Sequence, residues 1–179
     1  MLRARIVLAC AVMATVLGVI APASAQGWQT FRHPKLGFSL NYPDNWSITN
    51  GPTGVVFMVL GPNPTGVQGL RLNVNVTYEE IPGGMSVEDY DTQNESGLGL
   101  LFNGYRRLRT DKTMIGPYPA VVRYYTWKRN DGMELYQLQL VTIAGTRGYV
   151  VTGTTATSST RLPDETKLLV NILLTFRPQ

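Results

Sequence analysis

Leu70-Arg71-Leu72-Asn73-Val74-Asn75-Val76-Thr77-Tyr78 alternates apolar and polar side chains. Successive side chains of a β-strand point to opposite faces of a sheet, so this alternation predicts a strand with one face in the core. Pro82, Gly83 and Gly84 follow closely and predict the end of that strand. The chain is therefore expected to build its core on a sheet.

Four more strands are predicted nearer the C-terminus, at residues 105–114, 118–127, 133–143 and 148–155. Short turn sequences connect them, among them Asn130-Asp131-Gly132 and Ala144-Gly145-Thr146. Consecutive strands joined by such turns pair in an antiparallel sense, and the whole segment predicts a meander.

Upstream of residue 70 the chain predicts a hairpin and one buried strand. The hairpin joins residues 29–32 and 38–42 across the turn Pro34-Lys35-Leu36-Gly37. Residues 55–60 form a continuous apolar run whose length and β-branched content favour a buried strand. Residues 61–69, rich in glycine and proline, predict a loop.

Two helices complete the predicted fold. The first spans residues 87–102, after a capping signal in which Asp89 follows Ser86, and its apolar face is expected at Val87, Tyr90, Leu98, Leu101 and Phe102. The second starts near Pro163, and its apolar face is expected at Leu168, Leu169, Ile172 and Leu173. Together these elements predict an α+β fold, a layered α/β/α sandwich with a central, mostly antiparallel sheet of six to seven strands.

Four short motifs occur in the same order as in a known family: Phe38-x-x-x-Tyr42-Pro43-x-x-Trp46, Ile115-Gly116-x-x-Pro119-Ala120, Tyr149-Val150-Val151-Thr152 and Leu173-Leu174-Thr175-Phe176. With them, the chain resembles the PsbP-like domains. That family includes the extrinsic PsbP protein of photosystem II, DcrB-type bacterial envelope proteins and a Ran-binding import factor. The resemblance implies an antiparallel sheet covered by helices, in a domain that acts by binding or assembly. It implies no catalytic residues. Pro117-Tyr118 and Thr175 depart from the family pattern.

Residues 1–25 have the three parts of a secretory signal peptide. Arg3 and Arg5 form a positive start, residues 6–21 an apolar core, and Ala23-Ser24-Ala25 a cleavage site. Cleavage after Ala25 leaves a single PsbP-like domain, residues 26–179, which is extracytoplasmic, either periplasmic or secreted. One alternative is a retained anchor, although 16 apolar or small residues fall short of the roughly 20 that span a bilayer. The other is lipidation at Cys10, in the lipoprotein-like box Val7-Leu8-Ala9-Cys10.

The composition of residues 26–179 excludes several classes of function. Cys10 is the only cysteine, so the domain contains no disulfide and no thiolate ligand or nucleophile. Removal of Arg3 and Arg5 lowers the formal charge from +4 to +2. Basic and acidic residues are then too nearly equal in number to indicate a nucleic-acid partner. His33 is the only histidine, and we interpret it as a partly exposed turn residue. No cofactor is predicted.

The densest basic region offers a possible partner surface. Its candidate residues come from two neighbouring predicted strands: Arg106, Arg107, Arg109, Arg123, Tyr124, Tyr125 and Trp127. Such a surface would suit an envelope protein or an anionic surface. The alternative is a solvent-facing region whose long side chains cover aromatic edges.

A second candidate site is acidic. Glu88, Asp91 and Glu95 share one face of the first predicted helix, where they could offer oxygen ligands to a divalent cation. The alternative is a solvated helix face whose acids complement the helix dipole.

Three functions remain open from the sequence. The leading hypothesis is an exported, non-catalytic binding or assembly-accessory protein of the cell envelope, without a transmembrane span after cleavage. A small-molecule or lipid carrier would need an apolar cavity between sheet and helix. A carboxylate-based hydrolase would need two acids, such as Glu79, Glu80 or Glu134, across one cleft.

Overall fold

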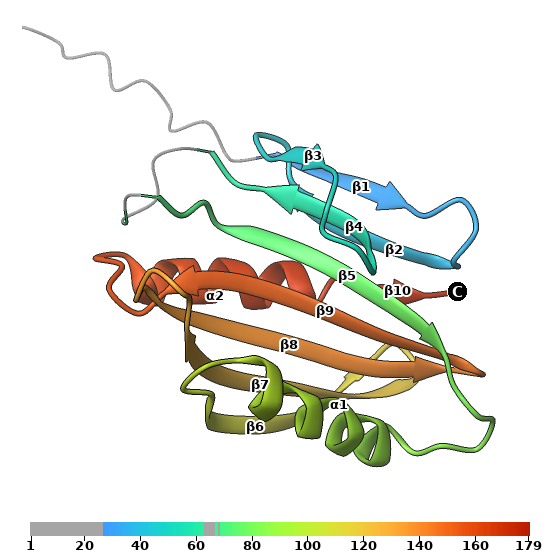
Figure 1. The fold of residues 1–179 in the computed structure, drawn as a ribbon. Coiled ribbons are helices and arrows are strands. Elements are labelled where there is room, and N and C mark those ends of the chain that lie inside the picture. The colour runs from blue at the N-terminus through green and yellow to red at the C-terminus, as the bar shows by residue number, and fades with distance from the viewer. Residues whose placement is uncertain (1–26, 63–66, 68) are drawn as a thin grey trace, which may run out of the picture.

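The main sheet of this protein has seven strands. A computed structural model describes residues 27–62, 67 and 69–179, so the predicted signal peptide lies outside the described residues. The strands are β3 (Ser47–Thr49), β4 (Val55–Leu60), β5 (Asn73–Glu80), β6 (Arg106–Ile115), β7 (Tyr118–Lys128), β8 (Glu134–Ala144) and β9 (Arg147–Ala156). They lie in the order β3-β4-β5-β9-β8-β7-β6, and every neighbouring pair is antiparallel (Figure 1). The predicted meander is confirmed as β6 to β9.

A smaller sheet packs beside the main one. It contains β1 (Trp28–Arg32), β2 (Phe38–Pro43) and β10 (Arg177–Pro178), in the order β1-β2-β10. The predicted hairpin is therefore confirmed as β1 and β2. In its turn, the Nδ1 of His33 accepts hydrogen bonds from the backbone N–H groups of Lys35 and Leu36. Burial and the charge of Lys35 lower the pKa of this turn histidine.

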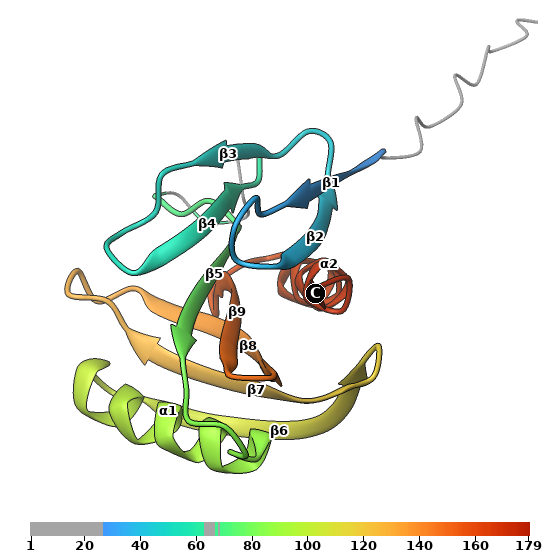
Figure 2. The same cartoon turned by 90° about the vertical axis from the view of Figure 1, so that its right-hand side faces the viewer.

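The two helices cover opposite faces of the main sheet, as the sandwich prediction requires (Figure 2). Helix α2 (Leu162–Leu173) buries Leu169, Ile172 and Leu173 in the larger apolar core, together with strand residues of both sheets. Helix α1 (Val87–Leu101) packs on β7 and β8 from the other side. One covering layer therefore consists of α1, and the other of α2 with the small sheet.

The N-terminus of α1 has the predicted cap. Ser86 Oγ accepts a hydrogen bond from the backbone N–H of Asp89 at 3.0 Å. The predicted apolar face is correct for Val87 and Tyr90, which are buried, and wrong for Leu101, which is 77% exposed. The second half of α1 therefore contributes little to an apolar contact with the sheet.

The strand predicted at residues 70–78 begins slightly later in the structure, because Leu70 to Leu72 precede β5. Its alternation is nevertheless correct: Leu72, Val74 and Val76 are all buried in the larger core. The short strands β3 and β10 were not predicted, since two or three residues cannot show a period of two.

Helix α2 approaches the sheet so closely that one strand position requires glycine. A Cβ atom on Gly153 would lie 2.8 Å from Leu138 Cδ1 and 3.2 Å from Leu169 Cβ. Gly153→Ala should therefore lower the free energy of unfolding by about 1–3 kcal/mol, the usual effect of overpacking. Chemical denaturation measures this effect.

Gly97→Ala in α1 is the matched control. A Cβ at Gly97 meets nothing within 4 Å, so this variant should gain about 0.5–1 kcal/mol from helix propensity alone. Equal effects of the two substitutions would contradict the proposed close contact between α2 and β9.

Candidate functional site

The acidic face of α1 lies against the basic strand β6. Glu88 Oε1 accepts a hydrogen bond from Lys112 Nζ at 3.0 Å, and Glu95 Oε2 accepts one from Arg107 Nη1 at 2.8 Å. The bond from Lys112 holds the pKa of Glu88 below its ordinary value. Both basic side chains of these pairs are more than half exposed, so the pairs orient α1 more than they stabilise it.

A third pair, between Asp91 and Arg123, is buried. The side chain of Arg123 in β7 is fully buried, and its Nη2 contacts both the carboxylate and the backbone carbonyl oxygen of Asp91. Its Nε and Nη1 have no hydrogen-bond partner among the described residues. Arg123 was predicted on a partner surface; that prediction is wrong, because α1 covers this face of β7.

The three pairs also change the interpretation of the acidic helix face. Glu88, Asp91 and Glu95 each contact a basic side chain. Within residues 27–62, 67 and 69–179, no three His, Cys, Asp or Glu side chains gather where they could hold a metal ion. The acidic face of α1 was one predicted site and the basic strands were the other. The structure joins them as the two sides of one contact between α1 and the sheet.

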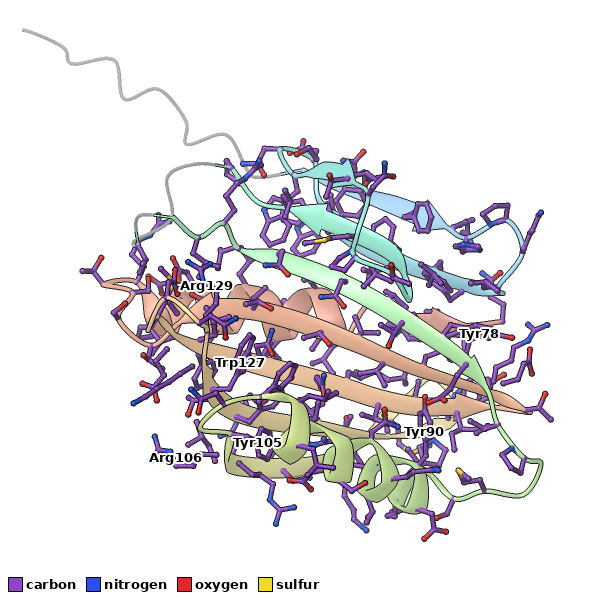
Figure 3. The ribbon with its side chains drawn as sticks, viewed as in Figure 1. Tyr78, Tyr90, Tyr105, Arg106, Trp127 and Arg129 are labelled. Atoms are coloured by element: carbon purple, nitrogen blue, oxygen red, sulfur yellow. The ribbon has the colours of Figure 1, made fainter. Side chains whose placement is uncertain are left out.

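Aromatic side chains close the C-terminal end of this contact. Phe102 stacks on Trp127 with ring centroids 4.4 Å apart, and on Tyr125 at 6.3 Å. Tyr105 donates a hydrogen bond to Glu95 at 2.8 Å, and burial together with that bond raises the pKa of Tyr105 to about 12. Figure 3 shows Tyr105 and Trp127 at this end of α1.

Two of the predicted surface tyrosines are buried on opposite faces of β7. Tyr125 lies under α1 with no exposed area, and burial raises the pKa of its hydroxyl. Tyr124 faces the other side, where the guanidinium carbon of Arg109 lies 4.1 Å from its ring centroid. Tyr124 and Tyr125 were predicted on the partner surface, and their burial corrects that prediction.

The exposed part of the predicted surface is β6. This strand ends the main sheet, and residues 106–112 are all exposed. It pairs with β7, with a bulge between Arg107 and Arg109, so these two arginines lie on opposite faces. Arg106 extends away from the sheet (Figure 3). The basic surface therefore consists of an outer sheet edge.

Beneath α1 the sheet carries two polar rows that the sequence analysis did not identify. Pairing across four strands aligns Arg123 with Gln139, Thr152 and Asn75, and aligns Tyr125 with Gln137, Thr154 and Asn73. Gln137, Gln139, Thr152 and Thr154 are buried. The sequence does signal these positions, because Gln137 and Gln139 alternate with leucines in β8, but that pattern normally indicates a solvent-facing side.

A cavity of about 280 Å³ lies between these rows and α1. Its polar lining consists of amides and hydroxyls from the sheet and the helix: Asn75, Thr77, Asn94, Gln137, Gln139 and Thr152. Tyr125 also lines it, and the Tyr125 hydroxyl has no hydrogen-bond partner among the described residues. The cavity expected for an apolar carrier is therefore in the expected place, but its lining is mixed, since Leu98, Phe102 and Val150 are its apolar members.

Solved structures of other proteins share this architecture. No protein-family model and no curated protein sequence matches the chain. The solved structure of CyanoP, the cyanobacterial PsbP of Synechocystis, matches with a TM-score of 0.61 at 17% identity, over 91% of this chain and 99% of that one. LpqN of Mycobacterium tuberculosis, described as involved in cell envelope biogenesis, matches with a TM-score of 0.61 at 12% identity, over 85% and 91%.

The Ran-binding protein Mog1p of Saccharomyces cerevisiae matches with a TM-score of 0.59 at 8% identity, over 86% of this chain and 96% of that one. The chain has the PsbP/Mog1p-like fold. The residues that carried the sequence resemblance form part of its larger core, among them Phe38, Trp46, Ala120, Tyr149 and Phe176. The PsbP-like fold thus explains those motifs as packing positions.

The PsbP-like fold separates the acids suggested for a hydrolase. Glu79 and Glu80 end β5, where they accept hydrogen bonds from Tyr90 and Tyr78. Glu134 begins β8, at the end of the sheet where β5 starts. The structure therefore does not bring Glu134 into one cleft with the other two. Neither helix of the described part of the chain has the length and apolar character needed to cross a membrane.

The buried pair of Asp91 and Arg123 gives a test of how α1 is held. Asp91→Ala should lower the free energy of unfolding by about 3–5 kcal/mol, because it leaves the charge of Arg123 buried without a partner. Glu88→Ala removes an exposed pair of the same helix and should leave the denaturation midpoint nearly unchanged. Urea denaturation measures both variants. If they lose similar free energies of unfolding, the buried pair is no more important for stability than the exposed one.

Proposed function

We propose that this chain is an exported, non-catalytic binding protein that assembles with an acidic partner through the outer edge of β6. The observation that carries the proposal is the exposure of this strand. Its seven consecutive residues from Arg106 to Lys112 are exposed at the end of the main sheet, and four of them are basic. Asp111 is the single acidic residue among them.

An outer strand can bind an extended segment of another protein, because its unpaired backbone N–H and C=O groups form a new ladder with that segment. Arginine and lysine side chains along the strand add attraction for acidic residues of the partner. The same charges repel β6 of a second copy. These properties favour a hetero-association with an acidic segment over self-association.

Export and the envelope context support the same proposal. The signal peptide predicted at residues 1–25 would deliver the domain outside the cytoplasm, and LpqN, which has the same fold, is described as involved in cell envelope biogenesis. Mog1p, with the same fold, is described as Ran-binding. We therefore look for the partner among envelope proteins, or among anionic envelope surfaces.

Export has its own test. Expressed in a bacterial host, the protein should accumulate outside the cytoplasm with Gln26 as its first residue, which cell fractionation and mass spectrometry of the intact protein can show. Ala25→Leu should leave the longer precursor, because the cleavage site requires small residues. Cys10→Ser should change nothing; loss of processing in Cys10→Ser would identify the lipoprotein alternative instead.

Site-specific photo-crosslinking tests the β6 surface. A photoreactive amino acid replacing Leu108, which is 43% exposed in β6, should give an adduct with one defined envelope protein. The matched control replaces Ile48, 55% exposed in β3 at the opposite edge of the same sheet, and should give no such adduct.

Arg106→Glu combined with Arg109→Glu should lower the adduct yield at position 108 by about tenfold, since like charges across an interface are unfavourable. Circular dichroism should show that the double variant remains folded. Equal adducts from positions 108 and 48, or a yield insensitive to charge reversal, would reject β6 as the docking edge.

A further inference from the structure

The polar cavity under α1 has features of a binding site that are independent of β6. Its walls come from four strands and a helix, and the side chains that form them are buried or half-buried. The interior of a domain normally packs apolar side chains against a helix. Here amides and hydroxyls share the walls of about 280 Å³ of space with the apolar side chains Leu98, Phe102 and Val150.

Hydrogen bonds hold the walls of this cavity in place. Gln137 donates to Thr154 Oγ1 at 2.8 Å and accepts from Trp127 Nε1 at 2.8 Å. Gln139 donates to Thr152 Oγ1 at 3.2 Å. From the helix side, Asn94 donates to the backbone oxygen of Tyr90 at 2.9 Å. The polar groups are therefore oriented before any ligand enters, which lowers the entropy lost on binding.

The polar groups that a ligand can reach lie on the wall of the cavity. Asn75, Thr77 and Asn94 are half-buried there, and Gln139 and Thr152 keep a small exposed area. Tyr125 lies beneath them with no exposed area, so its hydroxyl is out of reach of a molecule in the cavity.

The charge and shape of the lining narrow the class of ligand. None of the residues that line the cavity is charged. The nearby charge of Arg123 is already balanced by Asp91, so an ionic ligand would be buried without a counter-charge. Amides and hydroxyls both donate and accept, as the hydroxyls of a polyol do. The ring of Phe102 adds a flat apolar wall.

We propose that this cavity binds a small uncharged polyhydroxylated ligand, one sugar ring in size. The ring hydroxyls exchange hydrogen bonds with Thr77, Gln139 and Thr152, while the C–H groups of the ring pack against Phe102. The cavity volume lies near the lower end of the range for small-molecule sites, which suits a single ring. This site is distinct from the β6 edge, so either proposal can fail without the other.

The test measures affinity by isothermal titration calorimetry on the purified protein. The probes are D-glucose and N-acetyl-D-glucosamine as neutral rings, and D-glucuronate as an anionic ring of the same size. At least one neutral probe should bind, and more tightly than glucuronate. Absence of binding by both neutral probes, or tighter binding of glucuronate, would overturn the proposal.

Two conservative variants localise the binding, and the first of them separates it from folding. Thr77→Val should weaken binding of the neutral probe by about tenfold through the loss of one hydrogen bond, and valine should be tolerated in β5 because it has the shape of threonine and favours strands. Thr152→Val should also weaken binding, and it should lower the unfolding midpoint because Gln139 loses its hydrogen bond to Thr152 Oγ1. An unchanged affinity in Thr77→Val would contradict the site.

The matched controls remove the same groups on the other face of the sheet. Tyr149→Phe loses a hydroxyl bonded to the backbone oxygen of Leu36, and Thr142→Val one bonded to that of Pro119. Both controls should lower the unfolding midpoint and leave the affinity for the neutral probe unchanged. Equal affinities in Thr77→Val, Thr152→Val and the unmodified protein would place the binding elsewhere and reject the cavity as the site.

Discussion

The contact between Asp91 and the buried guanidinium of Arg123 determines how α1 lies on the sheet. A charge inside a protein must be neutralised where it is buried, and Arg123 is fully buried in the middle of β7. Helix α1 provides the opposite charge, and it buries only two apolar side chains, Val87 and Tyr90. These two lie in a second, smaller apolar cluster with Val121, Val141 and Val150, whereas α2 buries three apolar residues in the larger core, so polar contacts have a larger share in positioning α1.

This polar attachment also explains why a cavity forms on that face. Beyond Asp91, the helix presents Asn94, Leu98 and two glycines, and Leu100 and Leu101 point to solvent. Too few large apolar side chains face the sheet there to fill the space above Gln137 and Gln139. The next close contact is the stacking of Phe102 on Trp127, so α1 spans the cavity between a charged contact and an aromatic one.

The sequence predicts the fold better than the site for a physical reason. The alternation in Leu72, Val74 and Val76 reports which side of β5 is buried, and the turns report antiparallel pairing. In β7 both faces are covered, so the same alternation cannot distinguish Arg123 under α1 from an arginine in water. The acidic helix pairs with the basic strand because of where α1 crosses the sheet. That position is set by the tertiary structure and cannot be predicted from a local sequence pattern.

The two faces of the sheet differ in how tightly they are packed, and this difference indicates which face can carry a binding site. The α2 face is filled by close-packed apolar residues such as Phe38, Leu140 and Phe176, where a change of volume is unfavourable. It carries most of the motif residues that resemble PsbP-like domains, although Val150 and Thr152 of one motif face α1, and proteins of 8–17% identity share the same fold. The α1 face has no such packing requirement at its cavity. Its polar residues can change without loss of the core, so a binding specificity particular to this chain should depend on Thr77 and Gln139 more than on the core that proteins of similar fold share.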